Sequence, residues 1–262
     1  MKCAVIGLVK GYNKLNKYHE LIERNNKLYE NFIKFYPYDV IIAHEGNIIK
    51  RHQEYLQNNS QINLIFLDIS DYWNNIEGSG YNKMCRFWIN QVYKYIQNYD
   101  YILRLDDDGL LVDKVPYDIF QHMKDNDYEY GYIRRKIDKK KKLGKVPAKY
   151  QNSPHKDVTI ESFCFNYFNQ DLKPRYNFYN NFFTIKVSVW NKPELQKFIN
   201  SVENRNNNFY REGKLGFWGD SNVQAVCVKK WISKEKIVCF TGIKYKHGSH
   251  GYTNYPDVKH EW

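Results

Sequence analysis

Apolar segments of strand length alternate with segments of helical periodicity through the first half of this 262-residue chain, and this alternation narrows the possible folds most. The expected strands are residues 3–8, 39–44, 62–69 and 100–105, and the expected helices are 16–35, 48–57 and 81–97. In the last helix, apolar residues recur every three or four positions, which is typical of one buried face. Strands that alternate with helices pair in parallel, so we predict an α/β domain with a largely parallel sheet.

The second half is less regular and carries one strongly basic stretch. The expected helices are 117–124, 157–170, 193–202 and 220–231, and the expected strands are 128–133, 182–189 and 237–240. Residues 134–145 are rich in Lys and Arg, which indicates an exposed loop. Since no repeat and no linker interrupts the pattern, we expect a single domain over 1–262.

Charge, hydropathy and cysteine usage restrict the class of protein. The net charge of +11 favours polyanionic partners or phosphorylated ligands. Nucleic acid is not expected as a partner, because the basic stretch lacks interleaved stacking aromatics and no DNA-binding motif is recognisable. No apolar run approaches the roughly 20 residues of a membrane span, and the apolar start ends at Lys10 without a cleavage site. Five Cys without a CxxC pair suit reduced core thiols, so we predict a soluble, cytoplasmic protein.

Three consecutive carboxylates, Asp106, Asp107 and Asp108, follow the strand 100–105. Ligands of parallel sheets bind outside the carboxyl ends of the strands, where this triplet falls. Adjacent carboxylates repel one another unless a cation compensates, and Mn²⁺ or Mg²⁺ bound by carboxylate oxygens can share the diphosphate of a nucleotide. Alternating side-chain direction places Asp106 and Asp108 on one face. A solvated turn is the alternative, but Arg104 within the strand supplies a counter-charge that such a turn does not need.

Further candidates lie near the end of the chain. His247 is our first choice as third metal ligand and His250 the second, because a neutral imidazole can complete a shell begun by carboxylates. Lys246, or Lys244, could bind a phosphate; the alternative for the whole segment is a flexible tail with surface histidines. Asp220 opens an expected helix, so it is either a helix cap or a catalytic carboxylate that accepts a proton from a substrate hydroxyl or binds hydroxyls.

Three residues of the first half complete the set. Tyr81 and Arg86 lie off the centre of the buried stripe of helix 81–97 and could reach a bound ligand. Lys10 follows the first strand, where it could pair with a diphosphate or simply occupy a loop.

Several of these residues stand in segments that resemble a known family. Residues 81–87, 99–108, 117–120 and 130–131 resemble, in order and spacing, the central block of the fungal-type α-1,2-mannosyltransferases of glycosyltransferase family 15, and residues 217–224 look like its Trp-Gly-Asp segment. The resemblance implies a GT-A fold with a mixed central sheet, a nucleoside-diphosphate sugar donor, Mn²⁺ and retention of anomeric configuration. Within the domain it suggests that 1–110 bind the nucleotide sugar and 111–262 the acceptor.

Residue by residue, the family's metal-binding Glu-Pro-Asp falls on Asp106, Asp107 and Asp108, its donor-site Tyr on Tyr81, and its Trp-Gly-Asp carboxylate on Asp220. One departure concerns the mechanism: Phe183 replaces the Glu proposed as nucleophile. Retention here would therefore proceed by front-face attack, with the leaving phosphate taking the acceptor proton.

The sequence as a whole predicts a metal-dependent glycosyltransferase that moves a hexose, mannose being the family's sugar, from GDP-mannose or a UDP-sugar to a hydroxyl of a glycan acceptor. The expected metal ligands are Asp106, Asp108 and His247; the expected donor-binding residues are Lys10, Tyr81, Arg86, Asp106 and Lys246; the expected catalytic residue is Asp220. A catalytically inactive sugar- or polyanion-binding protein on the same fold is the alternative.

Overall fold

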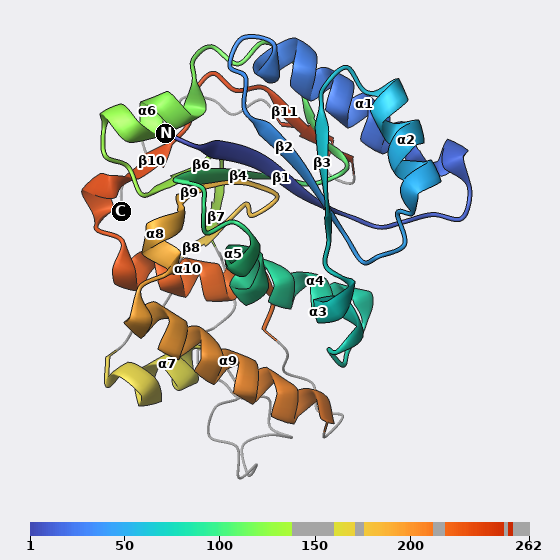
Figure 1. The fold of residues 1–262 in the computed structure, drawn as a ribbon. Helices are drawn as coiled ribbons and strands as arrows, with labels where there is room; N and C mark the ends of the chain where they lie inside the picture. Colours follow the sequence, from blue (N-terminus) through green and yellow to red (C-terminus); the bar gives the residue numbers. More distant parts are fainter. Residues whose placement is uncertain (138–159, 171–175, 212–217, 249–250, 254–262) are drawn as a thin grey trace.

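The computed structural model describes residues 1–137, 160–170, 176–211, 218–248 and 251–253 (Figure 1). Its strands are β1 Cys3–Val9, β2 Asp39–His44, β3 Leu64–Asp68, β4 Tyr101–Leu105, β5 Gly109–Leu111, β6 Tyr130–Tyr132, β7 Arg135–Ile137, β8 Tyr176–Phe178, β9 Phe182–Lys186, β10 Ile237–Cys239, β11 Tyr245–His247 and β12 Gly251–Thr253. Its α-helices are α1 His19–Leu28, α2 Lys50–Asn59, α3 Ser70–Asn74, α4 Gly80–Arg86, α5 Val92–Tyr95, α6 Ile119–Asp125, α7 Ile160–Phe168, α8 Val187–Trp190, α9 Pro193–Arg211 and α10 Asp220–Trp231. Short 3-10 segments cover Leu15–Tyr18 and Lys234–Lys236.

A seven-stranded sheet of order β10-β6-β9-β4-β1-β2-β3 forms the centre of the molecule. Strand β4 lies between β1, its parallel neighbour, and β9, which runs antiparallel to both β4 and β6. The predicted α/β architecture with a mixed central sheet is therefore confirmed. A separate three-stranded sheet joins β5 to β11 and β11 to β12. Because β5 follows the acidic triplet, this small sheet brings the chain's last described segments to the carboxyl end of β4.

Side chains of the central strands alternate between two hydrophobic cores, one on each face of the sheet. Ala4 and Ile6 of β1 pack with α4, α5 and α10, whereas Cys3 and Val5 pack with α1 and α6. Figure 1 shows α1 and α2 on one side of β1–β3 and the helices α4, α5 and α10 on the other. Burial on both faces explains why these strands read as continuous apolar runs.

Several sequence predictions needed correction in detail. The helix expected over 81–97 is interrupted by a π-helical turn at Phe87–Gln91, and another π turn, Tyr29–Ile33, follows α1. The strand expected over 182–189 ends at Lys186, where α8 begins. Residues 135–137 of the basic stretch were expected in a loop, but they form β7, which pairs with β8. Residues 138–145 lie outside the described part. The segment 244–252, for which a flexible tail was the alternative, contains β11 at Tyr245–His247.

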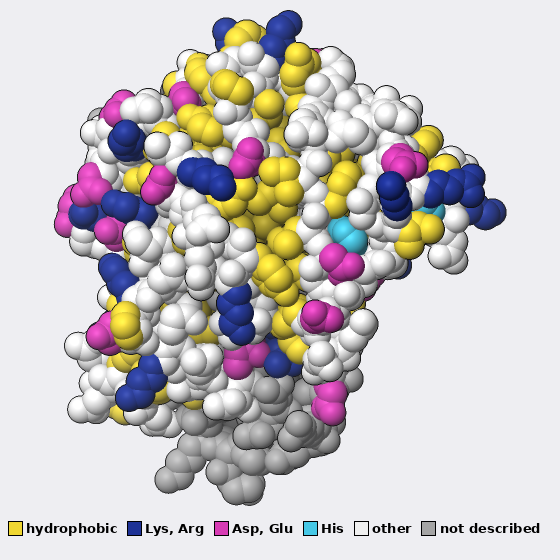
Figure 2. Space-filling model, viewed as in Figure 1, with side chains coloured by type: hydrophobic (Ala, Val, Ile, Leu, Met, Phe, Trp, Pro, Cys, Tyr) yellow, Lys and Arg dark blue, Asp and Glu magenta, His cyan; other side chains and the backbone are white. Residues whose placement is uncertain are grey.

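All five cysteines lie in the described part as free thiols, four of them buried, as the sequence predicts. Among the described residues, no helix combines the length and the apolar character that a membrane crossing requires. On the face drawn in Figure 2, Lys and Arg side chains are interspersed with Asp and Glu and form no continuous basic patch. The net positive charge therefore does not by itself mark a polyanion-binding surface on that face.

Candidate active site

The acidic triplet forms a turn at the carboxyl end of β4. The Asp106 amide donates to the Asn181 carbonyl at 3.3 Å, and the Gly109 amide donates to the Asp106 carbonyl at 3.1 Å. Because this turn interrupts the strand, strict alternation of side chains ends at Leu105. The three carboxylates consequently meet three different sets of neighbours.

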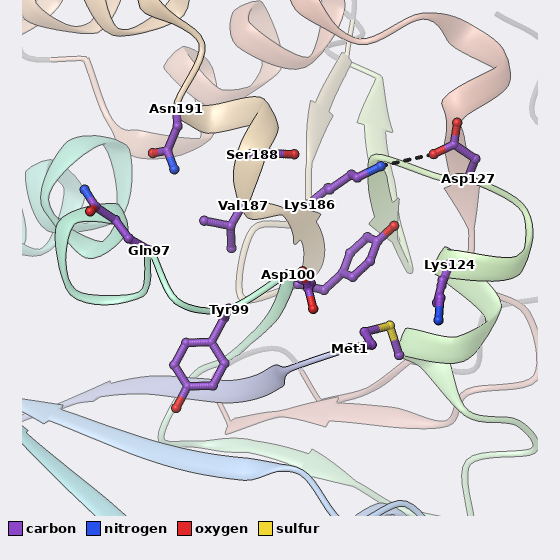
Figure 3. A pocket seen from close by; sticks show the side chains of 11 residues that line it. Met1, Gln97, Tyr99, Asp100, Lys124, Asp127, Lys186, Val187, Ser188 and Asn191 are labelled. Atoms are coloured by element: carbon purple, nitrogen blue, oxygen red, sulfur yellow. Dashed lines mark hydrogen bonds and ion pairs between the residues drawn. The ribbon is translucent and has the colours of Figure 1, made fainter.

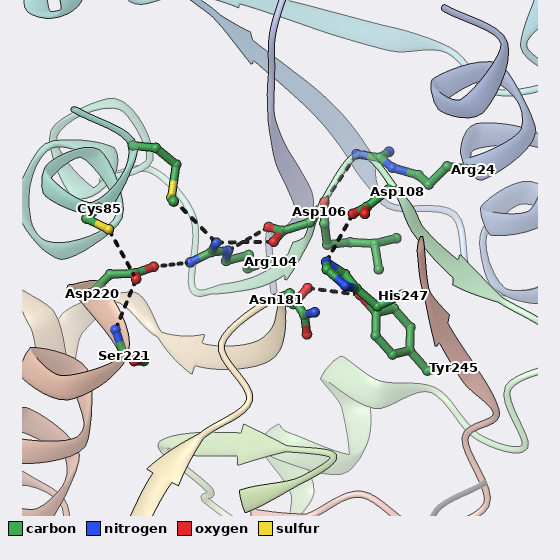
Figure 4. A network of polar contacts seen from close by, with 12 residues as sticks. Arg24, Cys85, Arg104, Asp106, Asp108, Asn181, Asp220, Ser221, Tyr245 and His247 are labelled. Carbon is green, nitrogen blue, oxygen red and sulfur yellow. Dashed lines mark hydrogen bonds and ion pairs between the residues drawn. The ribbon is translucent and has the colours of Figure 1, made fainter. Parts of the chain in front are cut away.

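Asp108 faces His247, which β11 brings alongside β5 with His247 opposite Gly109. The His247 Nε2 atom lies 3.1 Å from Asp108 Oδ1, and both side chains are partly exposed. The Asp108 carboxylate is also the main reason that the pKa of His247 is raised above its ordinary value. The structure thus joins two residues far apart in the sequence into one solvent-accessible pair (Figure 4).

Asp106 is bound to Arg104 rather than to His247. Arg104 Nε and Nη2 donate to its two carboxylate oxygens at 2.8 and 3.3 Å. The same guanidinium donates from Nη1 to Asp220 Oδ2 at 2.7 Å and lies 4.2 Å above the Trp88 ring. Arg104 is 3% exposed, so the two carboxylates neutralise a buried charge.

Asp220 is buried, and each of its carboxylate oxygens has a partner. Its Oδ1 accepts from the Ser221 amide at 3.0 Å and lies 3.5 Å from the Cys85 Sγ, while Arg104 occupies Oδ2. The helix-cap prediction for Asp220 is wrong, because Gly219 is the cap residue of α10 and Asp220 already belongs to the helix. These contacts favour a role in holding Arg104 over proton transfer.

Asp107 points into a pocket of about 370 Å³ between β1, β2 and α4. The pocket is lined by Leu8, Val9, Lys10, Glu45, Trp73, Gly80, Met84 and Asp107. Burial, then the charges of Asp106 and Asp108, raise the pKa of Asp107 to about 6. Lys10 is exposed and lines the same pocket as Asp107, and its pairing with a diphosphate stays a prediction.

The remaining expected donor residues differ in their surroundings. Tyr81 is 62% exposed, and a side chain at Gly219 would lie 3.3 Å from its hydroxyl, so Tyr81 borders the Asp220 network. Lys246 lines a second pocket, of about 360 Å³, together with Asp108, Glu20 and Glu23.

Arg86 is buried and donates from Nε to Glu203 Oε2 at 2.7 Å. That ion pair favours a structural role for Arg86, and its contact with a donor stays a prediction. His250 lies outside the described residues.

A further pocket, of about 560 Å³, lies at the opposite end of the strands, where β4 begins (Figure 3). Asp100, Lys124, Asp127 and Lys186 are among the residues that line it. Lys186 donates to Asp127 at 3.1 Å, so part of its charge is already compensated. Since ligands of such sheets bind at the carboxyl ends of the strands, we place the active site at the acidic turn.

Asp108 and His247 have the chemistry of a site for Mn²⁺ or Mg²⁺. A carboxylate oxygen and an imidazole nitrogen are ligands that Mn²⁺ accepts, and the two side chains are already adjacent. No three His, Cys, Asp or Glu side chains form a metal centre within the described residues. Asp106, which we expected as a ligand, would have to leave Arg104 in part to take that role.

Sequence reasoning missed two residues of this region. Glu45 follows β2 and reaches the pocket beside Asp107. Arg24 of α1 lies buried beneath the turn, where it donates to the Leu105 carbonyl at 3.2 Å. A signal for Arg24 existed, because it occupies the same helix face as Leu21 and Leu28, both of which are buried.

Comparisons with known proteins identify the family of this chain. A family model described as "Glycolipid 2-alpha-mannosyltransferase" matches residues 71–262, which include the acidic turn, Asp220 and His247. The chain is 24% identical over 180 residues to the glycolipid 2-alpha-mannosyltransferase of Saccharomyces cerevisiae, covering 64% of this chain and 38% of that protein. It is 25% identical over 186 residues to glycolipid 2-alpha-mannosyltransferase 1 of Candida albicans, covering 67% and 41%. The chain therefore spans about two fifths of the length of these relatives.

Solved structures show the same fold. The mannosyltransferase Ktr4p of S. cerevisiae superposes with a TM-score of 0.72 at 19% identity, covering 94% of this chain and 70% of that one. Core-mannan synthase A of Aspergillus fumigatus, in an Mn/GDP form, superposes with a TM-score of 0.69 at 18% identity, covering 94% and 74%. The fold is accordingly the GT-A type that the sequence predicts. With most of its length matched by the family model, the chain belongs to the glycolipid 2-alpha-mannosyltransferase family.

Proposed function

We propose that this chain transfers a mannosyl residue from GDP-mannose to a hydroxyl of a glycan acceptor, with retention, and that Mn²⁺ or Mg²⁺ supports the reaction. The observation that carries the proposal is the Asp108–His247 pair beside a pocket at the carboxyl end of β4. The similar core-mannan synthase A structure is an Mn/GDP form, and a second structure of Ktr4p is a complex with GDP, which supports this donor and metal.

The pocket of about 370 Å³ has room for a nucleoside, and its residues suit one. Trp73 offers an aromatic face for the base, while the Glu45 carboxylate can accept from the N1–H and N2 amino group of guanine. Uracil offers a single ring N–H in the same role, so Glu45 favours guanine. Lys10 at the rim is placed to pair with a diphosphate that extends toward Asp108.

A divalent cation bound at Asp108 and His247 would neutralise negative charge on the departing diphosphate. The chain's own contribution is to fix these two side chains on β5 and β11 and to hold Asp106 and Asp220 on Arg104. Tyr81 stands exposed next to Gly219, where it can contact the donor sugar. Residues that line the nucleoside pocket all precede 110, which supports a donor half at 1–110 and an acceptor half at 111–262.

Front-face attack is the retaining route that fits this chain. Phe183, at the position of the family nucleophile, is buried and stacks on Tyr130 at 5.8 Å, and the adjacent Thr184 is also buried. In the front-face step the acceptor oxygen bonds to the anomeric carbon as the bond from that carbon to the phosphate oxygen breaks on the same face. The acceptor proton passes to the leaving phosphate oxygen, so no carboxylate nucleophile is needed.

The test is to measure GDP release and mannosyl transfer from GDP-mannose to small mannosides, with Mn²⁺ and with EDTA, using UDP-sugars as matched donors. Metal-dependent transfer from GDP-mannose is expected, with the product α-linked. Mn²⁺-linked GDP binding without turnover would contradict the proposed transfer. No metal-linked binding of any sugar nucleotide would contradict it as well and would favour the alternative, a catalytically inactive sugar- or polyanion-binding protein.

A further inference from the structure

Arg24 is a charged side chain with no exposure to solvent, located directly beneath the acidic turn. Its Nη2 donates to the Leu105 carbonyl at 3.2 Å, the peptide group immediately before Asp106, and its Nη1 donates to Asn25 Oδ1 at 2.8 Å. Its buried Nε has no hydrogen-bond partner in the described part of the chain. Figure 4 shows this guanidinium reaching the turn from α1, on the side away from Arg104.

Burying a guanidinium without a direct carboxylate partner is costly. No ion pair within 4.0 Å joins Arg24 to a carboxylate of the described residues, and burial lowers its pKa to about 10, so it remains charged at neutral pH. The charges that oppose this lowering are, in order, Asp107 and Asp106. An apolar side chain of similar length would fill the same space without this cost, so packing alone does not account for an arginine here.

Strand β1 makes room for Arg24 through a glycine. A Cβ atom at Gly7 would lie 2.2 Å from Arg24 Nη2 and 2.8 Å from the Leu105 carbonyl oxygen. Any side chain at Gly7 would therefore displace either the guanidinium or the end of β4. Gly7 and Arg24 both precede the family-matched segment, whereas the turn they support lies within it.

Arg104 cannot replace Arg24 in this position. Its three nitrogens are occupied by Asp106 and Asp220, on the opposite side of β4. Arg24 is thus the buried cation on the side of the strand where the backbone turns toward Asp107 and Asp108.

We propose that Arg24 is a positioning residue, which holds the Leu105 carbonyl in the niche left by Gly7 and so fixes the turn that presents Asp107 and Asp108 to the metal and diphosphate of the donor. The metal and donor in this inference rest on the proposed function. Arg24 touches neither; it acts through the backbone of the turn.

The experiment compares Arg24→Met, Arg24→Lys and Gly7→Ala with a control, Leu28→Ala, which removes a fully buried side chain from the same helix and core. Binding of Mn²⁺ alone is followed by the electron paramagnetic resonance signal of the free ion, and GDP binding in the presence of Mn²⁺ by calorimetry. Thermal unfolding without metal gives the stability of each variant. Arg24→Lys and Gly7→Ala keep the positive charge and serve as the test if Arg24→Met does not fold.

Positioning predicts that Arg24→Met, Arg24→Lys and Gly7→Ala each weaken Mn²⁺ binding at least fivefold, while Leu28→Ala lowers the unfolding temperature but changes Mn²⁺ binding less than twofold. Tighter Mn²⁺ binding by Arg24→Met would mean that Arg24 acts only as a repelling charge and would overturn the proposal. Unchanged binding in the folded variants would overturn it as well. Because these readouts need no turnover, a wild-type chain that binds Mn²⁺ and GDP without transferring mannose would refute the function and leave this inference testable.

Discussion

Two residues of one tripeptide have opposite surroundings. Asp106, itself partly exposed, is held on the buried Arg104, whose guanidinium also binds Asp220 and lies above the Trp88 ring. Asp108, two positions further on, is partly exposed and pairs with His247, whose strand comes from the far end of the chain. The difference shows that consecutive carboxylates need not act together: one anchors the turn to the core and the other remains available to a ligand.

The largest expected effect is a loss of stability when the ion pairs of Arg104 with Asp106 and Asp220 are removed. Arg104→Met leaves the buried Asp220 and the partly exposed Asp106 without their shared counter-charge, and removing one partner of a buried ion pair costs about 3–5 kcal/mol. We expect this loss in the free energy of unfolding, measured by urea denaturation. Adding Asp220→Asn to Arg104→Met removes one of the stranded charges and should recover at least about 1 kcal/mol. Equal stability of wild type and Arg104→Met would contradict the anchoring role.

Removing the charge of Asp108, which forms the partly exposed pair with His247, should remove mannosyl transfer and leave the fold intact. Asp108→Asn keeps the shape of the side chain but loses the charge that a divalent cation requires, so mannosyl transfer should fall by about 100-fold or more. The free energy of unfolding should change by less than about 1 kcal/mol, because the pair with His247 is partly exposed. Asp113→Asn is the matched control, since Asp113 lies just after β5, as Asp108 lies just before it, and pairs with Lys244 at the surface. Full transfer activity in Asp108→Asn would remove Asp108 from the site.

The sequence could locate the acidic turn but could not predict that Asp106 and Asp108 have different partners. Continuous apolar runs identify β1, β2 and β4 because these strands are buried on both faces, and the triplet follows β4 directly. The partners of Asp106 and Asp108 depend on long-range packing of α10 and β11. Strand β11 has three residues and pairs with the equally short β5, so neither has enough alternation to be recognised.

Arg24 and Asp220 illustrate a second limit. Charged residues are expected on the outside, so an Arg on the buried face of a helix is discounted, although Leu21 and Leu28 on the same face mark its direction. For Asp220 the sequence allowed a helix cap, and the structure gives the capping position to Gly219 and the carboxylate to Arg104. In both cases a partner distant in the sequence decides the role, the Leu105 carbonyl for Arg24 and Arg104 for Asp220, and no local pattern encodes it.

A third prediction extends the comparison to the pocket beside Asp107. Glu45→Gln keeps the length of the side chain but replaces one acceptor oxygen with a donor, which meets the guanine amino group unfavourably. We expect GDP to bind about 10-fold more weakly in the presence of Mn²⁺, while UDP binding changes less than threefold. Calorimetric titration of both nucleotides measures the ratio. Glu54→Gln, on the surface of α2, is the control, and an equal loss for GDP and UDP would show that Glu45 does not read the base.

The smallest effect on stability is expected from a substitution of Cys85, whose Sγ contacts Asp220. Burial raises the pKa of this thiol to about 12, whereas an unfolded cysteine titrates near about 8.5. At neutral pH both states keep the proton, so Cys85→Ala should cost only about 1 kcal/mol for the lost thiol contact and the small cavity.

Above about pH 9 the unfolded wild-type chain loses a proton that the folded chain retains, and stability therefore falls as pH rises. The variant lacks this contribution, so its free energy of unfolding should fall less steeply between about pH 9 and 11, by at most about 1.4 kcal/mol per pH unit. Urea denaturation of both proteins across this range measures the slopes, and parallel slopes would mean that Cys85 is not held as a buried thiol against Asp220.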